Sequence, residues 1–384
     1  MRSLDEFADG KLAALERAKL RRTLSVTARD GIYAERGGRR LLSFSCNDYL
    51  NLSGHPAIIK AAVDAAQRYG VGAGASRLVT GNHPLYEALE SRLARLKGTD
   101  AACVFGSGYL ANTGIIPALV GRGDLLLVDE LSHACINGGA TLSGATVHRY
   151  RHSDVADAKA LLEAHRTGHA HALIATDGVF SMDGDLAPLS ELSALAQHYD
   201  AWLLADDAHG LGVVGDGRGS AFANGPADVP LQMGTLSKAV GAYGGYLCAS
   251  QSVIDLMRTR ARSFIYSTGL PPPVVAAAIA ALDLIASEPD YVAMPLQKAR
   301  LFARALNLPE AQSAVVPVII GDTDATLAAS QMLEDEGFLV VPIRPPTVPA
   351  GTARLRFAFT AQHPDAEIER LAHIVRSQVL DRRQ

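Results

Sequence analysis

The sequence predicts an α/β fold in which a mostly parallel β-sheet is covered by helices on both faces, followed by a smaller α+β domain. Two observations lead to this prediction. Helix-like runs alternate with short β-rich runs over much of the chain, which is the pattern of parallel strands joined by helices. After about residue 287 this pattern changes, and 384 residues are too many for one compact domain. We therefore expect an N-terminal helix and hairpin segment (residues 1–45), a large domain (residues 46–286) and a small C-terminal domain (residues 287–384).

The N-terminal segment combines an amphipathic run with a hairpin. Apolar residues recur on one face of residues 4–24, which predicts a helix. Residues 31–44 are interrupted by Gly37-Gly38, which is typical of a hairpin turn.

In the two domains, the elements follow from runs of helical period and from short runs of high β-propensity. In the large domain we expect helices at residues 57–69, 85–96 and 110–119 and strands at residues 101–105, 124–128, 146–150, 171–175, 202–205 and 246–249. In the small domain we expect strands at residues 315–320, 338–341 and 355–359 and helices at residues 324–336 and 364–380. Ser107, Asp129, Asp177 and Asp206 lie just beyond expected strand ends. Ligand sites gather at the carboxyl ends of parallel strands, so we expect a site at this edge.

Composition argues against several classes of function. A net charge of −4 and a pI near 6.3 do not favour binding to nucleic acid or to an anionic membrane. The four cysteines lack C-x-x-C spacing, which predicts neither a zinc site nor a disulfide framework, and we expect no metal and a reducing, cytoplasmic location. The N-terminus is acidic, unlike a signal peptide, and the apolar residues 274–286 are too short to span a bilayer.

Lys238 is the most informative residue. It follows Thr235 and Ser237 and precedes a glycine-rich run, which suits a buried amine beside a bound phosphate. Upstream, an apolar strand ends at Asp206, with His209 three residues later. Pyridoxal phosphate requires a Schiff-base lysine and an acid at its ring nitrogen, so these residues together predict that cofactor.

Asp206 and His209 have distinct predicted roles. The carboxylate of Asp206 would keep the pyridine nitrogen protonated, and His209 would donate to the ring phenolate. The same sequence also fits a loop N-cap or a metal pair, although no third ligand with suitable spacing appears.

Two further motifs have an open interpretation when taken alone. The run 106–112 follows a strand and opens a helix, so its N–H groups can hold an anion, but it also matches a dinucleotide fingerprint and an ordinary tight turn. His133 follows the strand that ends near Asp129, where a histidine either caps a helix or stacks on a planar cofactor.

Two loops near the expected edge are also ambiguous. Asp183-Gly184-Asp185 hints at a calcium loop, but a turn that presents Ser181 fits better because the closing glutamate is missing. Arg354 and Arg356 lie on one face of a strand, either as solvated charges or with one of them binding a substrate carboxylate.

Several of these motifs occur together in one known family. The chain resembles the α-oxoamine synthases, which are fold-type I pyridoxal phosphate enzymes, from about residue 21 to its end. The motifs that carry the resemblance are Asn47-Asp48-Tyr49-Leu50, Ser76-Arg77, residues 177–184, Asp206-Asp207-Ala208-His209-Gly210, Thr235-Leu236-Ser237-Lys238 and Ile265-Tyr266-Ser267-Thr268.

Residues 343–356 resemble the member of the family that acts in biotin synthesis. This resemblance implies a decarboxylative condensation of L-alanine with a pimeloyl thioester, with either coenzyme A or acyl carrier protein as the thiol carrier. Glycine-using relatives, namely 2-amino-3-ketobutyrate ligase and 5-aminolevulinate synthase, remain the alternative.

The resemblance also implies a role for each matched residue. Lys238 is the Schiff-base lysine, Asp206 pairs with the pyridinium and His133 stacks on the ring. The other cofactor contacts are Gly108, Tyr109, Ser181, His209, Thr235 and, from a second subunit, Thr268. The implied substrate contacts are Arg21, Asn47, His133, Thr347 and Arg356. Thr268 therefore implies a homodimer with active sites at the subunit interface.

The chain departs from the family pattern at three positions. Asp177 stands where glutamate is commoner, Ala75 where glycine is frequent and Gly269 where serine is usual. The shorter carboxylate of Asp177 is expected to loosen a contact near the substrate.

Overall fold

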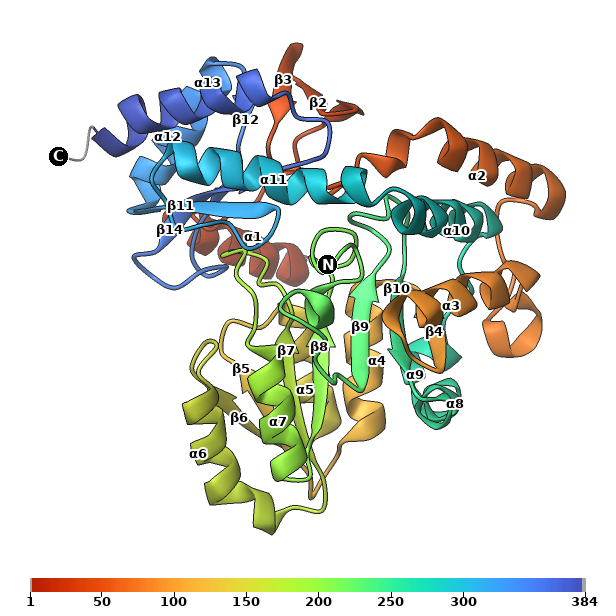
Figure 1. Cartoon of the computed structure of the whole chain (residues 1–384). Helices are drawn as coiled ribbons and strands as arrows, with labels where there is room; N and C mark the ends of the chain where they lie inside the picture. The colour runs from red at the N-terminus through yellow and green to blue at the C-terminus, as the bar shows by residue number, and fades with distance from the viewer. Residues whose placement is uncertain (1, 382–384) are drawn as a thin grey trace.

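The computed structural model describes residues 2–381, and a seven-stranded sheet forms the centre of its large domain (Figure 1). The strand order is β4-β10-β9-β8-β7-β5-β6. The strands are β4 (Ala101–Phe105), β5 (Leu125–Asp129), β6 (Thr146–Tyr150), β7 (Ala172–Asp177), β8 (Trp202–Asp206), β9 (Leu231–Thr235) and β10 (Gly245–Ala249). Neighbours from β9 to β6 pair in parallel, whereas β10 is antiparallel to β4 and β9. The predicted mostly parallel sheet is confirmed.

Helices cover both faces of this sheet. Along β5, Leu126 and Val128 pack into one core with α4, α5 and α8, whereas Leu125 and Leu127 pack into another with α6 and α7. Alternate residues of a strand point to opposite faces, so two covered faces explain the continuous apolar runs in the sequence. The helices of this domain are α2 (Pro56–Tyr69), α3 (Pro84–Lys97), α4 (Gly108–Leu119), α5 (Ala134–Ser143), α6 (Val155–His165), α7 (Leu189–His198), α8 (Gln251–Arg260), α9 (Arg262–Ile265) and α10 (Pro272–Ser287).

A smaller layer lies above the large sheet in Figure 1. Its elements are α11 (Pro289–Ala305), β11 (Val315–Gly321), α12 (Thr323–Asp335), β12 (Phe338–Leu339), β13 (Pro342–Ile343), β14 (Ala353–Ala358) and α13 (Asp365–Val375). Strands β11, β14 and β13 form an antiparallel sheet around a core that contains Phe302, Phe357 and Phe359. The predicted small α+β domain is therefore present.

The N-terminal segment consists of α1 (Arg2–Arg17), β1 (Ala28–Asp30), β2 (Tyr33–Arg36) and β3 (Arg39–Ser43). Strand β3 pairs in parallel with β12, and Phe44 joins the aromatic core of the C-terminal domain. This segment thus shares a sheet and a core with the small domain, and the segment boundaries at 45 and 286 stay predictions.

Three local predictions differ from the structure. Helix α1 ends at Arg17 instead of residue 24, and Lys19 has a φ of 55°, which helical backbone does not adopt. Of the expected strand 338–341 only residues 338–339 form a strand, β12, and β13 begins after it at Pro342 in another sheet. Strand β9 was not predicted because Gln232 and Gly234 interrupt its apolar pattern.

The structure explains the two residues that hide β9. Buried Gln232 donates to the carbonyl of Lys97 at 3.2 Å. A Cβ on Gly234 would lie 2.4 Å from the hydroxyl of Tyr246, so glycine is required there. Within residues 2–381, no single helix has the length and apolar character needed to cross a membrane; only the bent pair of α10 and α11 meets those two criteria jointly.

Candidate active site

The carboxyl edge of the large sheet brings the predicted polar residues together. Asp129, Asp177, Asp206 and Thr235 are the last residues of β5, β7, β8 and β9, respectively. Beside them lies a cavity of about 180 Å³, here called the inner cavity. It is lined by Ser107, Gly108, Tyr109, His133, Cys135, Asp177, Val179, Ser181, Asp206, Ala208, His209, Met233, Thr235, Ser237 and Lys238.

One wall of the inner cavity is the N-terminus of α4, which is built to hold an anion. Ser107 caps the helix by accepting from the N–H of Leu110 at 3.1 Å. The N–H groups of Gly108 and Tyr109 have no acceptor within residues 2–381. A Cβ on Gly108 would lie 3.6 Å from the Thr235 hydroxyl, so glycine keeps the space between them open. Free N–H groups, a helix dipole and a facing hydroxyl suit a phosphate.

Asp206 is held in place by donors from two helices and a turn. Asn112 on α4 donates to Oδ2 at 2.7 Å, and the N–H of Ala208 donates to Oδ1 at 3.0 Å. The thiol of Cys135 lies 3.7 Å from Oδ2, and burial together with the Asp206 charge raises the pKa of that thiol. Sequence reasoning missed Asn112 and Cys135 as site residues, because a polar residue inside an otherwise apolar helix carries no signal of its target.

Lys238 lies on the loop after β9 and reaches into the same cavity. Burial lowers the pKa of its amine, against the opposing effect of Asp206 and Asp177. Lys238 is partly exposed, and no hydrogen bond or ion pair to its Nζ is present within the described chain. Thr235 and Ser237 bond to each other through their hydroxyls at 2.8 Å and face the same space. A buried amine with a lowered pKa and no partner is a candidate nucleophile and base.

His133 forms the opposite wall and caps α5. Its Nδ1 accepts from the N–H of Cys135 at 3.2 Å, so the proton of the neutral ring lies on Nε2. Burial lowers the pKa of His133, which favours this neutral ring. The backbone N–H of His133 donates to Asp177 at 3.1 Å, and burial followed by the charge of Asp206 raises the pKa of Asp177. His133 therefore performs the capping role and also faces the cavity.

A second cavity of about 260 Å³, here called the outer cavity, adjoins the inner one through shared residues. It is lined by Ser45, Asn47, His133, Ser181, Met182, His209, Lys238, Val341, Ile343 and Arg356. Arg356 is 7% exposed and donates to the carbonyl of Ser181 at 2.5 Å and from both Nη atoms to Asn47 at 3.2 Å. A guanidinium beside an open space suits a carboxylate ligand.

Arg356 and His209 belong to one buried network. Sequence reasoning did not assign Tyr49 to the site. Its hydroxyl bonds to Nδ1 of His209 at 2.6 Å and accepts a hydrogen bond from Nη2 of Arg356 at 3.5 Å. Burial, and then the positive charges of Lys238 and Arg356, lower the pKa of His209 well below its usual value. His209 is therefore neutral at the junction of the two cavities.

The two arginines of β14 differ in their contacts. Arg354 forms an ion pair with Asp183 and donates to the carbonyl of Thr352 at 3.0 Å. It does not line either cavity, whereas Arg356 lines the outer one. Asp183 is thereby occupied by an arginine, and the loop places Ser181 in both cavities.

Three predicted residues lie outside both cavities. Thr268 is exposed and pairs with Ser76 in an isolated β-bridge. Arg21 is exposed and bonds to Glu16 at 3.2 Å. Thr347 is exposed and contacts Arg22 at 3.5 Å, so Arg21 and Thr347 share no partner among residues 2–381. Their predicted roles stay predictions.

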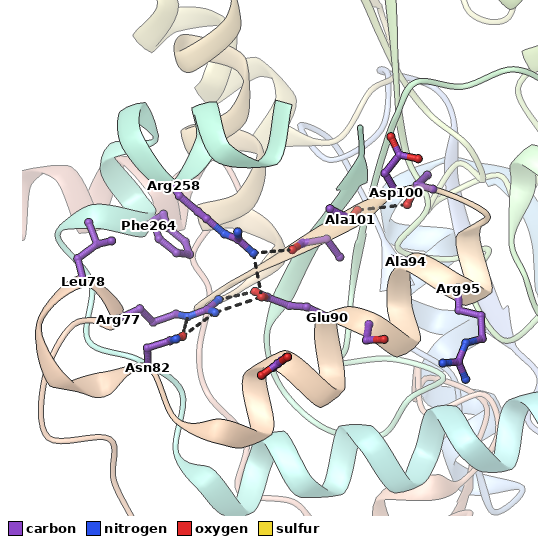
Figure 2. Close-up of a pocket in the computed structure, with 14 residues that line it drawn as sticks. Arg77, Leu78, Asn82, Glu90, Ala94, Arg95, Asp100, Ala101, Arg258 and Phe264 are labelled. Atoms are coloured by element: carbon purple, nitrogen blue, oxygen red, sulfur yellow. Dashed lines mark hydrogen bonds and ion pairs between the residues drawn. The ribbon is translucent and has the colours of Figure 1, made fainter. Parts of the chain in front are cut away.

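A cleft of about 650 Å³ lies at the β4 edge of the sheet and is here called the edge cleft (Figure 2). Figure 2 shows Arg77 and Arg258 converging on Glu90, with Asn82 beside Arg77. The buried charges of Arg77 and Glu90 in this cleft pair with each other, and Arg258 pairs with Glu90 as well. It shares no lining residue with the inner cavity.

Comparisons with known proteins agree with the geometry. A family model described as aminotransferase class I and II matches residues 39–375. The chain is 63% identical over 377 residues to an 8-amino-7-oxononanoate synthase from Beijerinckia indica, and the match covers 98% of each protein.

Two solved structures are also similar. Serine palmitoyltransferase from S. paucimobilis, with a bound PLP–myriocin aldimine, gives a TM-score of 0.90 at 29% identity, covering 97% of this chain and 96% of that one. An 8-amino-7-oxononanoate synthase from Francisella tularensis gives a TM-score of 0.76 at 25% identity, covering 90% and 99%.

Proposed function

Since the chain belongs to the aminotransferase class I and II family, and within it to the 8-amino-7-oxononanoate synthases, we propose that it condenses L-alanine with a pimeloyl thioester. The products are 8-amino-7-oxononanoate, carbon dioxide and the free thiol carrier, and the reaction serves biotin synthesis. One observation supports this function above the others. A buried amine without a partner, Lys238, faces a fixed carboxylate, Asp206, across a cavity that ends at a helix N-terminus.

The residues of the inner cavity fit pyridoxal phosphate. The N–H groups of Gly108 and Tyr109 and the hydroxyl of Thr235 would hold its phosphate, and Asp206 would pair with its ring nitrogen. When bound, the cofactor supplies an aldehyde that links to an amine and a ring that accepts an electron pair. His133 would cover the ring, and Ser181 and His209 would lie beside its phenolate oxygen.

Lys238 has the properties of the base that accepts the α-proton of alanine. Only a neutral amine accepts a proton, and burial raises the neutral fraction by lowering the pKa of Lys238. Arg356 with Asn47 would receive the alanine carboxylate in the outer cavity and so orient the Cα–H bond. Nε2–H of His133 would donate to the thioester oxygen as negative charge develops there.

The acyl end of the site discriminates this function from its alternatives. Glycine-using relatives such as 2-amino-3-ketobutyrate ligase and 5-aminolevulinate synthase require the same cofactor contacts. Arg21 and Thr347 are the acyl contacts implied by the family, and we propose that they engage the substrate near the mouth of the outer cavity. The carrier of the pimeloyl group is coenzyme A or acyl carrier protein.

The proposal includes a homodimer in a cytoplasmic setting. Thr268 is exposed and lines neither cavity of its own chain, which supports a contact with the phosphate bound by a second copy. Cys46, Cys103, Cys135 and Cys248 are all free thiols, which supports a reducing compartment.

Covalent trapping tests the cofactor site. Borohydride treatment of the purified, cofactor-loaded protein, followed by peptide mapping, should place a pyridoxyl group on Lys238. Lys97 is the matched control, because it is also buried but is ion-paired with Asp207 at 2.6 Å. An adduct elsewhere, or none, would refute the proposed site.

Turnover assays test the substrates. L-Alanine and glycine are each offered with pimeloyl-, acetyl- and succinyl-CoA, and with pimeloyl-acyl carrier protein. Alanine with a pimeloyl thioester should give the highest kcat/KM, and a preference for glycine would assign the chain to one of its relatives.

A further inference from the structure

Arg77 and Glu90 form a buried bidentate ion pair at the centre of the edge cleft (Figure 2). Nη1 of Arg77 donates to Oε1 of Glu90 at 2.5 Å, and Nη2 donates to Oε2 at 3.2 Å. Oε1 also accepts from the N–H of Val104 on β4 at 2.9 Å, and Oε2 from Arg258 at 3.3 Å. Both side chains are 8% exposed. Four donors on one buried carboxylate fix its position and that of the Arg77 fork.

Arg77 is held on its other sides as well. Its Nε and Nη2 donate to Oδ1 of Asn82 at 3.0 and 2.8 Å. Its guanidinium stacks over the ring of Tyr86 at 3.9 Å and faces Phe264 at 5.2 Å. The backbone at residue 77 therefore has little freedom relative to α3.

Ser76, the residue before Arg77, connects this restrained backbone to Thr268. Ser76 pairs with Thr268 in an antiparallel bridge, and the N–H of Gly269 donates to the carbonyl of Ala75 at 3.0 Å. The hydroxyl of Tyr86, under the Arg77 fork, bonds to the backbone N–H of Leu270. The segment that contains Thr268 thus rests on the loop that Arg77 anchors.

Neither residue of this bridge lines the inner or the outer cavity of its own chain. Thr268 is exposed, and three apolar residues close in sequence to the bridge, Leu78, Val79 and Tyr266, are 57%, 74% and 73% exposed. Large apolar side chains that point outward beside a polar residue suit contact with a second copy of the chain.

We propose that Arg77 and Glu90 are positioning residues that act between subunits, because they hold Thr268 where the phosphate site of a second copy receives its hydroxyl. This proposal rests on the proposed function, which supplies the phosphate and the dimer. Arg77 acts through Thr268 and does not touch the reacting atoms. Its loss should therefore damage the neighbouring site and leave its own site intact.

Two variants isolate the ion pair. Arg77→Lys keeps the charge but loses the fork, and Glu90→Gln keeps the shape but loses the charge. We expect each to raise the dissociation constant of pyridoxal phosphate about 10-fold, the effect of losing one charge-assisted contact. Thr268→Ala should give the same increase. Arg92→Lys is the matched control. Arg92 lies on α3, as Glu90 does, but pairs with Asp283 at the surface, so this variant should bind the cofactor like wild type.

Mixed dimers test whether the effect crosses the interface. A subunit with Lys238→Ala and its own Arg77 is co-expressed under a different tag with a subunit carrying Arg77→Lys and its own Lys238. One site of this dimer combines Lys238 from the second subunit with a correctly held Thr268 from the first. At a cofactor concentration near the wild-type dissociation constant, the mixed dimer should regain about half of the wild-type activity, well above either parent homodimer.

Each result has one meaning. Activity of the mixed dimer no higher than that of the Arg77→Lys homodimer would show that Arg77 acts within its own site and would overturn the proposal. A monomeric chain, or unchanged cofactor affinity in both Arg77→Lys and Glu90→Gln, would also overturn it. Should the Arg77→Lys subunit fail to fold, Glu90→Gln takes its place in the mixed dimer. Full activity of the Lys238→Ala homodimer would instead refute the proposed function.

Discussion

The edge cleft and the inner cavity differ in how their charges are matched, and this difference separates a structural site from a chemical one. In the cleft, Glu90 accepts from Arg77, Arg258 and a backbone N–H, so every buried charge has its partner. In the inner cavity, Lys238 has no partner among residues 2–381 and its pKa is lowered by burial. The cleft has the greater volume, about 650 Å³ against about 180 Å³. Size alone would therefore have selected the wrong hollow, whereas unmatched buried groups select the reactive one.

A buried group without a partner costs folding free energy, so it persists where function requires it. The N–H groups of Gly108 and Tyr109, which lie at the N-terminal end of α4 beside the inner cavity, also lack acceptors in the described chain. Substitutions at paired and at unpaired buried charges should therefore have different effects on activity and on stability.

The largest effect is expected from removal of the unmatched amine. Lys238→Ala should lower kcat by at least about 10⁴-fold, because it removes both the covalent attachment and the base. The melting temperature of the cofactor-free protein should be nearly unchanged, since Nζ of Lys238 makes no hydrogen bond or ion pair in the described chain. Steady-state turnover and a thermal melt measure the two expectations. Lys60→Ala, at an exposed surface pair with Asp64, is the control. Near-normal turnover of Lys238→Ala would contradict the claim that the unpaired amine of Lys238 marks the reactive cavity.

The second prediction compares two adjacent carboxylates. Asp206 lines the inner cavity, whereas Asp207 is paired with the buried amine of Lys97. Asp206→Asn should lower kcat about 10²- to 10³-fold with little change in stability, because the cavity loses the charge that faces the cofactor. Asp207→Asn should destabilise the fold by about 3–5 kcal/mol, because the buried amine of Lys97 then lacks its counter-charge. Turnover and urea unfolding of both variants test whether Asp206→Asn mainly lowers activity and Asp207→Asn mainly lowers stability. Equal losses of activity in the two variants would contradict it.

Sequence reasoning found the residues that follow strands and missed those that support them. Asp206 was predictable because it ends an apolar strand, where ligand sites gather, and Lys238 because it lies between two hydroxyl residues and a glycine-rich run. Asn112 and Tyr49 were missed because a helical asparagine and a buried tyrosine also occur in ordinary cores, and only the fold shows that they contact Asp206 and His209.

The fold was predictable to a similar extent. Alternating apolar runs indicated the parallel sheet, but β9 (residues 231–235) was hidden by Gln232 and Gly234. Both exceptions arise from contacts distant in sequence, to Lys97 and Tyr246. Local pattern therefore predicted the layers, while the exceptions required the packed structure.

The third prediction concerns the two arginines of β14, one matched and one open to the outer cavity. Arg356→Lys should raise the KM for L-alanine about 10- to 100-fold with a smaller change in kcat, because a lysine loses the planar fork. Arg354→Lys should change that KM by less than about twofold, since Arg354 is occupied by Asp183. Initial rates at varied alanine concentration test both. A larger effect at position 354 would reverse the assignment.

The smallest effect is expected at His152. This side chain lies near the site, but its ring is paired with two carboxylates. Its two ring nitrogens contact Asp129 at 3.2 Å and Asp185 at 2.8 Å. Burial disfavours the charged ring, but the hydrogen bonds to Asp129 and Asp185 outweigh it and raise the pKa of His152 to about 10. The imidazolium therefore ties the end of β5 to the loop that presents Ser181.

The sign of the pH dependence follows from that raised pKa. The folded chain binds the proton more tightly than the unfolded chain, whose histidine pKa is about 6.5. The stabilisation is complete below pH 6.5 and is lost as the pH rises towards 10. Because the side chain is one-quarter exposed (24%), we expect only about 1–2 kcal/mol. His152→Gln should thus be less stable than wild type at pH 6 and nearly equal at pH 10 in urea unfolding. His171→Gln, which removes an exposed histidine without an ion pair in the described chain, should show no such convergence. A difference between His152→Gln and wild type that stays constant with pH would show that packing, and not a matched charge, is what His152 contributes.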